Sequence, residues 1–576
     1  MYLRKLTRKK HGKEHIYWAL VESYRSSRGP RQRIVTYLSD LDAAGRVGVK
    51  LGAEQQDSYQ ASLFEQAEPR WVEINTREVS LERSRNFGEV WLALQLLQRL
   101  GLVEFFKSLL PVGREKIPWA ELAMVLITAR FCDPQSELHI AEHFYRSSAL
   151  ADLLGIPDDE VYDNRLYRAL DRILPHKAAL EKHLYERYGQ LFRISYDLLL
   201  YDVTSTYFEG LAEKNPQAKR GYSRDHRPDC KQICIALVVT QEGIPLGYEI
   251  FDGNTHDATT VQEIVEKIEG CYGVANRVWV MDRGMTSEEN IAFLNEGQRR
   301  YIIGTPKSML KQFERELLHG AWHTVRDGLE VQLCTSPHGQ ETFILCRSAT
   351  RQQKEQAIHQ RFVQRLEEGL RIIQRSCQNG RLKDPRVAER RIGRLLERNS
   401  RAAALFEIQV KENSSTGTLD LSWTIRHDRH QWAVLSEGCY LLRTNIRDWT
   451  ADALWQAYTQ LTEAEAAFRI HKSDLQLRPI WHQRPERVHA HILVCFLAYV
   501  LWKTLAQMCK KSGLGDEPRK VLDEIRQLKL ADVVLKTRQQ QIIRLRCVTK
   551  PEPALQLLLQ KLKLIPPQRL SVKHNL

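Results

Sequence analysis

The feature that most restricts the fold of this chain is a fixed order of short apolar runs between Leu198 and Gly304. We predict three strands there, a helix, a strand ending at Asp282, a second helix and a last strand, with bounds 198–202, 232–240, 245–251, 277–282 and 301–304 for the strands. Thr260 and Thr286 are predicted to cap the two helices. The resulting β-β-β-α-β-α-β order predicts an α/β domain.

Two of the predicted strands end in an acid. Asp202 follows the apolar run Leu198–Tyr201, and Asp282 closes the run 277–281. A carboxylate at the tip of a buried strand is costly unless something pairs with it. The strand order is that of an RNase H-like domain, in which the first and fourth strands lie side by side, so we expect both acids to converge.

A third acid, Glu465, lies in a predicted amphipathic helix over 450–472. Tyr458, Leu461, Glu465 and Lys472 occupy positions i, i+3, i+7 and i+14, which places them within about 60° of arc on one face. Glu463 is off this stripe. Three carboxylates would form the all-oxygen site that hard divalent cations prefer.

The charge balance favours a polyanionic partner. Lys and Arg number 85 and Asp and Glu 71, a net charge of +14, and nucleic acid is the commonest such partner. A membrane is disfavoured, because the longest apolar run, 492–502, is too short to span a bilayer. The N-terminus lacks an apolar run behind its basic residues, so we expect no signal peptide and a cytoplasmic location. The 11 cysteines are scattered along the chain, so we interpret them as structural residues.

These residues resemble a known family. The spacing Tyr458-x2-Leu461-x3-Glu465-x6-Lys472 is similar to the Tyr-x2-Arg-x3-Glu-x6-Lys signature of bacterial insertion-sequence DDE transposases of the IS-four group, with Leu461 in place of the arginine. The segments 201–208, 281–284, 467–469 and 478–480 also resemble a subgroup of that family. Arg469 or Arg478 could supply the phosphate contact of the missing arginine.

The resemblance implies a DNA transposase with an RNase H-like catalytic domain. Asp202, Asp282 and Glu465 would hold two Mg²⁺ or Mn²⁺ ions for DNA cleavage and strand transfer. Further DNA contacts are expected from Tyr458, Lys472, Arg469 and Arg478, and from Trp432 as a stacking residue, although core burial is the alternative for Trp432. Implied partners are the terminal inverted repeats, target DNA and a second copy of the chain in a homodimer, in a bacterial cytoplasm at the nucleoid.

Roughly 130 residues, 307–437, lie between the last predicted strand and the part of the chain that contains the helix of Glu465. We interpret them as a folded, β-containing insertion. The predicted domains are a small basic module (1–80), a helical DNA-end-binding region (81–193), the catalytic core in two parts (194–306 and 438–510), the insertion (307–437) and a C-terminal helical region (511–576).

Weaker signals remain open. Arg386, Arg390, Arg394 and Arg398 form either a phosphate-binding ridge or a solvated helix face. For His482, His489 and His491 we expect capping or packing. Two other functions remain: a stand-alone RNase H-like nuclease without strand transfer, and an inactive DNA-binding relic.

Overall fold

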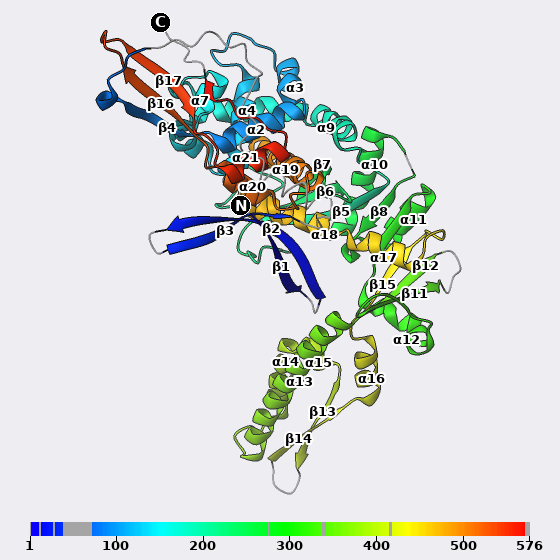
Figure 1. Ribbon diagram of the computed structural model, residues 1–576. Coiled ribbons are helices and arrows are strands. Elements are labelled where there is room, and N and C mark those ends of the chain that lie inside the picture. The colour runs from blue at the N-terminus through cyan, green and yellow to red at the C-terminus, as the bar shows by residue number, and fades with distance from the viewer. Residues whose placement is uncertain are drawn as a thin grey trace. The chain divides into compact units, whose positions relative to one another are not determined.

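The chain forms two compact units, which we describe separately. The structure is a computed structural model that describes residues 2–10, 13–26, 29–38, 72–274, 276–336, 341–413 and 418–570. Unit 1 comprises Met1–Ala275 and Thr462–Leu576, and unit 2 comprises Asn276–Leu461. Figure 1 shows the elements by label. The predicted six-part division is finer than these two units and stays a prediction.

The centre of unit 1 is an antiparallel sheet of β5 (Leu198–Tyr207), β6 (Gln232–Thr240) and β7 (Pro245–Asp252). Every residue of β6 is buried, so this strand is covered on both faces. The strands predicted over 232–240 and 245–251 are therefore confirmed. The first strand extends beyond its predicted end at Asp202, because Val203, Thr204 and Thr206 are β-branched and also buried.

Unit 1 is built around one long apolar helix, α19 (Pro485–Lys511). It packs against α2 (Gly88–Arg99), α4 (Trp119–Cys132), α8 (Asp163–Ile173) and β7. Its length and composition would suffice to cross a membrane, but its most apolar window is 100% buried within the fold. That burial is the pattern of a core helix.

Unit 1 also contains a three-stranded N-terminal sheet and further helices. They are the sheet β1 (Tyr2–Lys10), β2 (Lys13–Ser26), β3 (Gly29–Leu38), and the helices α3 (Leu102–Leu109), α5 (Glu137–His139), α6 (Tyr145–Ser147), α7 (Leu150–Leu154), α9 (Lys177–Phe192), α10 (Val261–Tyr272), α18 (Thr462–Arg469), α20 (Pro518–Ile525) and α21 (Pro553–Lys561). Residues 39–71 of the predicted N-terminal module lie outside the described residues.

The C-terminal region is not purely helical, so the prediction for 511–576 is wrong in this respect. β16 (Lys529–Lys536) and β17 (Ile542–Val548) form a sheet in the order β18-β17-β16-β4, with β18 (Arg569–Leu570) and β4 (Ser80–Asn86). Burial alternates along β16, which is the period of a strand. The pairing of β4 with β16 joins segments far apart in the sequence.

Unit 2 contains a six-stranded mixed sheet in the order β10-β11-β12-β15-β9-β8. β8 (Val278–Met281) and β9 (Arg300–Gly304) are parallel, and β15 (Cys439–Thr444) pairs antiparallel with β9. Three further strands extend the sheet: β10 (His323–Arg326), β11 (Leu329–Thr335) and β12 (Thr342–Ser348). These residues belong to the predicted insertion. The helices α11 (Glu288–Glu296), α12 (Glu314–His319), α16 (His427–Ser436) and α17 (Ala451–Thr459) complete this part of the unit.

The rest of the predicted insertion has an apolar core of its own. The long helix α13 (Ala349–Gln378), with α14 (Pro385–Arg398) and α15 (Ser400–Ala403), lies beside the hairpin β13–β14 (Phe406–Asn413 and Thr418–Ile425) (Figure 1). Leu366, Leu370, Ile392 and Leu421 are among its buried residues. The four arginines of the predicted ridge on α14 are all exposed.

Both predicted helix caps differ from the structure. The side chain of Ser287, one residue after Thr286, accepts from Asn290 N at 3.2 Å. Thr286 instead donates its hydroxyl to Gly304 O on β9 at 2.6 Å. Thr260 makes no side-chain cap and donates to Asp257 O at 2.6 Å. In each case the threonine hydroxyl donates a hydrogen bond to a backbone carbonyl, and its oxygen does not cap the helix that follows.

A buried ion-pair network attaches α9 to the sheet of unit 1. The Glu181 side chain is 1% exposed, and its Oε2 lies 2.8 Å from Lys267 Nζ on α10. Lys177 Nζ and Lys267 Nζ lie 2.9 and 2.6 Å from Glu249 Oε1 on β7. Two lysines therefore share two carboxylates inside the protein.

We predict that Glu181→Gln lowers the free energy of unfolding by about 3 kcal/mol, because it leaves a buried lysine pair with one carboxylate. Urea denaturation followed by fluorescence measures this change. Glu186→Gln, an exposed position of the same helix, is the control and should change stability by less than about 0.5 kcal/mol. Equal effects of the two substitutions would show that the network does not stabilise the fold.

Candidate active site

Asp202 lies within β5 rather than at its end, which corrects the prediction. The strand continues to Tyr207, and Asp202 pairs with Leu237 of β6 in the antiparallel register. The side chain is half-buried, and its Oδ1 accepts from Val203 N at 2.8 Å. This bond fixes one carboxylate oxygen beside its own strand.

Asp282 directly follows β8, as predicted, and begins a short 3-10 turn. Its carbonyl accepts from Met285 N at 3.0 Å, and its side chain is half-buried. Tyr458 of α17 lies nearby: burial raises the pKa of the Tyr458 hydroxyl, and the charge of Asp282 raises it further.

Gly304 makes room for that tyrosine. A Cβ at Gly304 would lie 2.5 Å from Tyr458 Oη and 3.1 Å from Arg283 N. Any larger residue would push Tyr458 away from the end of β9. The signature tyrosine and the second acid are thus held together within unit 2.

The helix of the third acid is interrupted, so the single helix predicted over 450–472 is wrong. α17 ends at Thr459, α18 begins at Thr462, and the π-helix η8 (Ile470–Asp474) follows. Glu465 lies in the first turn of α18 and is exposed. Leu461, at the position of the family's arginine, is buried at 7% exposure.

Glu463 has a different environment from Glu465. Its Oε2 lies 3.2 Å from Lys503 Nζ of α19, and that lysine side chain is 8% exposed. The competing acid therefore has a structural ion-pair partner.

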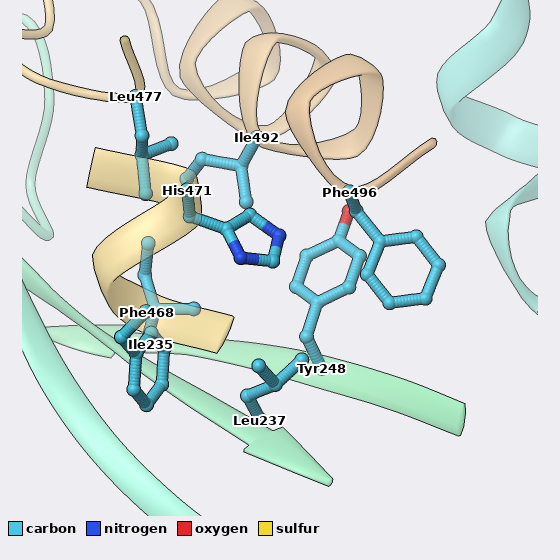
Figure 2. Close-up of a pocket in the computed structure, with 8 residues that line it drawn as sticks. All are labelled: Ile235, Leu237, Tyr248, Phe468, His471, Leu477, Ile492 and Phe496. Carbon is cyan, nitrogen blue, oxygen red and sulfur yellow. The ribbon is translucent and has the colours of Figure 1, made fainter. Parts of the chain in front are cut away.

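Apolar contacts with the sheet and with α19 position α18 in unit 1. Figure 2 shows Phe468 and His471, from α18 and η8, among Leu237 and Tyr248 of the sheet and Ile492 and Phe496 of α19. Burial lowers the pKa of His471 to about 4, so the ring is neutral, and its Nδ1–H donates to Ala467 O at 2.8 Å. α18 also packs directly on β5, the strand of Asp202.

Lys472 is an ion-pair partner rather than an exposed lysine on the stripe. Its Nζ lies 2.8 Å from Asp225 Oδ1, and Arg478 also pairs with this oxygen. The Asp225 side chain is 3% exposed. Burial lowers the pKa of Lys472, and the charge of Asp225 opposes that shift. The predicted DNA-contacting cations are thus brought together by a carboxylate that the sequence analysis did not identify.

Arg224, beside Asp225 in sequence, was also missed. It pairs with Asp257, and its backbone N donates to Ser205 Oγ of β5 at 3.2 Å. Burial lowers the pKa of Arg224, but Asp257 and the charge of Asp202 raise it overall. The Arg224 guanidinium therefore lies near Asp202. No local pattern in this polar segment indicates such a role.

The two other predicted DNA contacts lie in different environments. Arg469 is exposed at the end of α18. Trp432 of α16 is partly buried against the apolar cluster of Phe313, Phe343 and Leu441. Its stacking role stays a prediction.

Two family models match this chain. No curated protein matches the chain. A solved structure titled "Cryo-EM structure of piggyBac transposase synaptic complex with hairpin DNA" is 9% identical over 78% of this chain and 82% of that chain, with a TM-score of 0.35. A family model described as "IS1634 family transposase, N-terminal domain" matches residues 3–67. The model described as "Transposase DDE domain" matches residues 194–501, more than half of the chain, so this protein belongs to the DDE transposase family, whose members cleave DNA.

Proposed function

We propose that Asp202, Asp282 and Glu465 are the catalytic acids of this transposase and bind two Mg²⁺ or Mn²⁺ ions. The observation that carries this proposal is the placement of Glu465: it is exposed in the first turn of α18, and this helix packs on β5, the strand of Asp202. Asp202 and Asp282 are half-buried, and all three donors are carboxylates, which suit hard, partly hydrated cations. When bound, such ions polarise the scissile phosphate and lower the pKa of a bound water.

The surrounding residues would hold the DNA. Arg469 is exposed, and Tyr458 lies beside Asp282, so both are suited to contact the phosphates next to the cut. Arg478 and Lys472 would exchange part of their pairing with Asp225 for a DNA phosphate. The family's arginine would contact a DNA phosphate, and Leu461, which stands at its position, is buried. Arg224 is therefore a third candidate for this contact, beside Arg469 and Arg478.

The finer assignments belong to the same proposal. We place the catalytic domain in the RNase H-like fold and the chain in the IS-four group, on the strength of the strand order and the spacing from Tyr458 to Lys472. The protein would bind terminal inverted repeats as a homodimer and insert them into target DNA in the bacterial cytoplasm. A net charge of +14 suits such a polyanionic partner.

We predict that Asp202→Asn, Asp282→Asn and Glu465→Gln each lower the rate of DNA cleavage on the order of 10³-fold, because each loses transition-state stabilisation by a bound ion. Binding of element-end DNA should change little. Cleavage of labelled DNA in Mg²⁺ or Mn²⁺ gives the rate. Glu463→Gln is the matched control and should cleave normally. The reverse pattern for Glu463 and Glu465 would assign the third acid to Glu463.

A second prediction separates the transposase from a stand-alone nuclease. Purified protein given paired element ends and a target duplex should join a 3′-hydroxyl of the element to the target. A gel assay with labelled ends detects this product. Cleavage without any joined product, under conditions where the ends are cut to completion, would favour the nuclease.

A third prediction concerns Lys472. If it neutralises one phosphate, Lys472→Ala should weaken binding at every DNA sequence and reduce the slope of log K against log salt concentration by about 1. Lys182→Ala, an exposed lysine of α9, is the control. An unchanged slope with full joining activity would leave Lys472 as a partner of Asp225 only.

A further inference from the structure

We propose that Glu137, His482 and His491 form a structural zinc site in unit 1. One carboxylate oxygen of Glu137 and one ring nitrogen of each histidine lie within 4.8 Å of one another. Glu137 comes from α5, His482 from the segment before α19, and His491 from α19 itself. The proposal is independent of the catalytic ions, because nitrogen ligands select a different metal from an all-carboxylate site.

The spacing within this triad suits a shared metal ion. His482 Nε2 lies 3.4 Å from Glu137 Oε1. A charge-assisted hydrogen bond is usually about 2.7–2.9 Å long. Two ligands of a tetrahedral zinc ion with bonds of about 2.0–2.1 Å lie about 3.3–3.4 Å apart. The observed separation therefore matches two corners of a zinc site better than it matches a hydrogen bond.

His491 has the hydrogen-bonding pattern of a metal ligand. Its Nε2 lies 3.3 Å from Leu477 O, to which it can donate, and its Nδ1 is buried without a hydrogen-bond partner among the described residues. A neutral ring that donates through one nitrogen offers a lone pair on the other. Metal-bound histidines commonly show this arrangement.

A competing explanation uses only protein charges. Arg130 is 5% exposed and acts on the same carboxylate. In this explanation Arg130, together with His482 at 3.4 Å from the carboxylate, balances the charge of Glu137. That account leaves the buried Nδ1 of His491 without a partner, whereas a zinc ion bound to this nitrogen would satisfy it.

A zinc ion here would fix the segment that leads from the Lys472–Arg478 region to α19. Ile480 N donates to Tyr207 O at 2.9 Å at the end of β5, and His482 follows two residues later. Zinc would tie this segment to α5 and to the second turn of α19. Its role would be structural, like that of a cross-link between these elements.

Metal analysis of the full chain, expressed without a histidine tag, tests the proposal. We expect about one zinc per chain in the wild type and loss of most of it in His482→Ala and His491→Ala. His489→Ala is the matched control, because this residue of α19 is hydrogen-bonded to Gln217 Oε1 at 2.6 Å and lies outside the triad. It should keep its zinc.

A second readout does not depend on how the variants fold. A chelator should lower the thermal midpoint of the wild-type protein, and Zn²⁺, but not Mg²⁺, should restore it. Zinc-free wild-type protein whose thermal midpoint is unchanged by added Zn²⁺ would overturn the proposal and leave Glu137 as an ion-pair partner of His482 and Arg130. Neither result bears on DNA cleavage by the carboxylates, so the proposed function stands or fails separately.

Discussion

The region around the third acid depends on the ion pairs of the buried Asp225 carboxylate. Asp225 pairs with Lys472 of η8 and with Arg478, and its side chain is only 3% exposed. The preceding residue, Arg224, is anchored to Ser205 of β5. Removal of a carboxylate that balances two partly buried cations would cost about 3–5 kcal/mol, because the charges left behind remain poorly solvated. The ion pairs of Asp225 and the hydrogen bond from Arg224 N to Ser205 thereby join the strand of Asp202 to the helical segment after Glu465.

The elements that sequence predicts well are those whose signal is local. The bounds of β6 agree with the prediction, and β7 and β8 differ from it only at their ends, because continuous apolar, β-branched runs are typical of strands. The helix over 450–472 shows the limit of this approach. Its apolar spacing continues on both sides of Gln460 and Leu461, so periodicity does not reveal that α17 ends and α18 begins there.

The features that sequence could not predict depend on residues far apart in the chain. After Val203 the strand β5 continues through the hydroxyl residues 204–206, which are buried although their own pattern is not apolar, because other elements cover them. Asp225 and Lys472 are 247 positions apart, and no spacing rule relates them. The three proposed catalytic acids could be selected from sequence because strand order and a family signature identified them, whereas the roles of Arg224 and Asp225 required the fold.

The central claim is that Asp202, Asp282 and Glu465 bind the catalytic ions. Anomalous X-ray scattering from crystals grown with element-end DNA and Mn²⁺ tests it most directly, because manganese can be located without reference to activity. The account predicts anomalous peaks within bonding distance of carboxylate oxygens of all three residues. Manganese bound at other carboxylates, with none at these three, would contradict it.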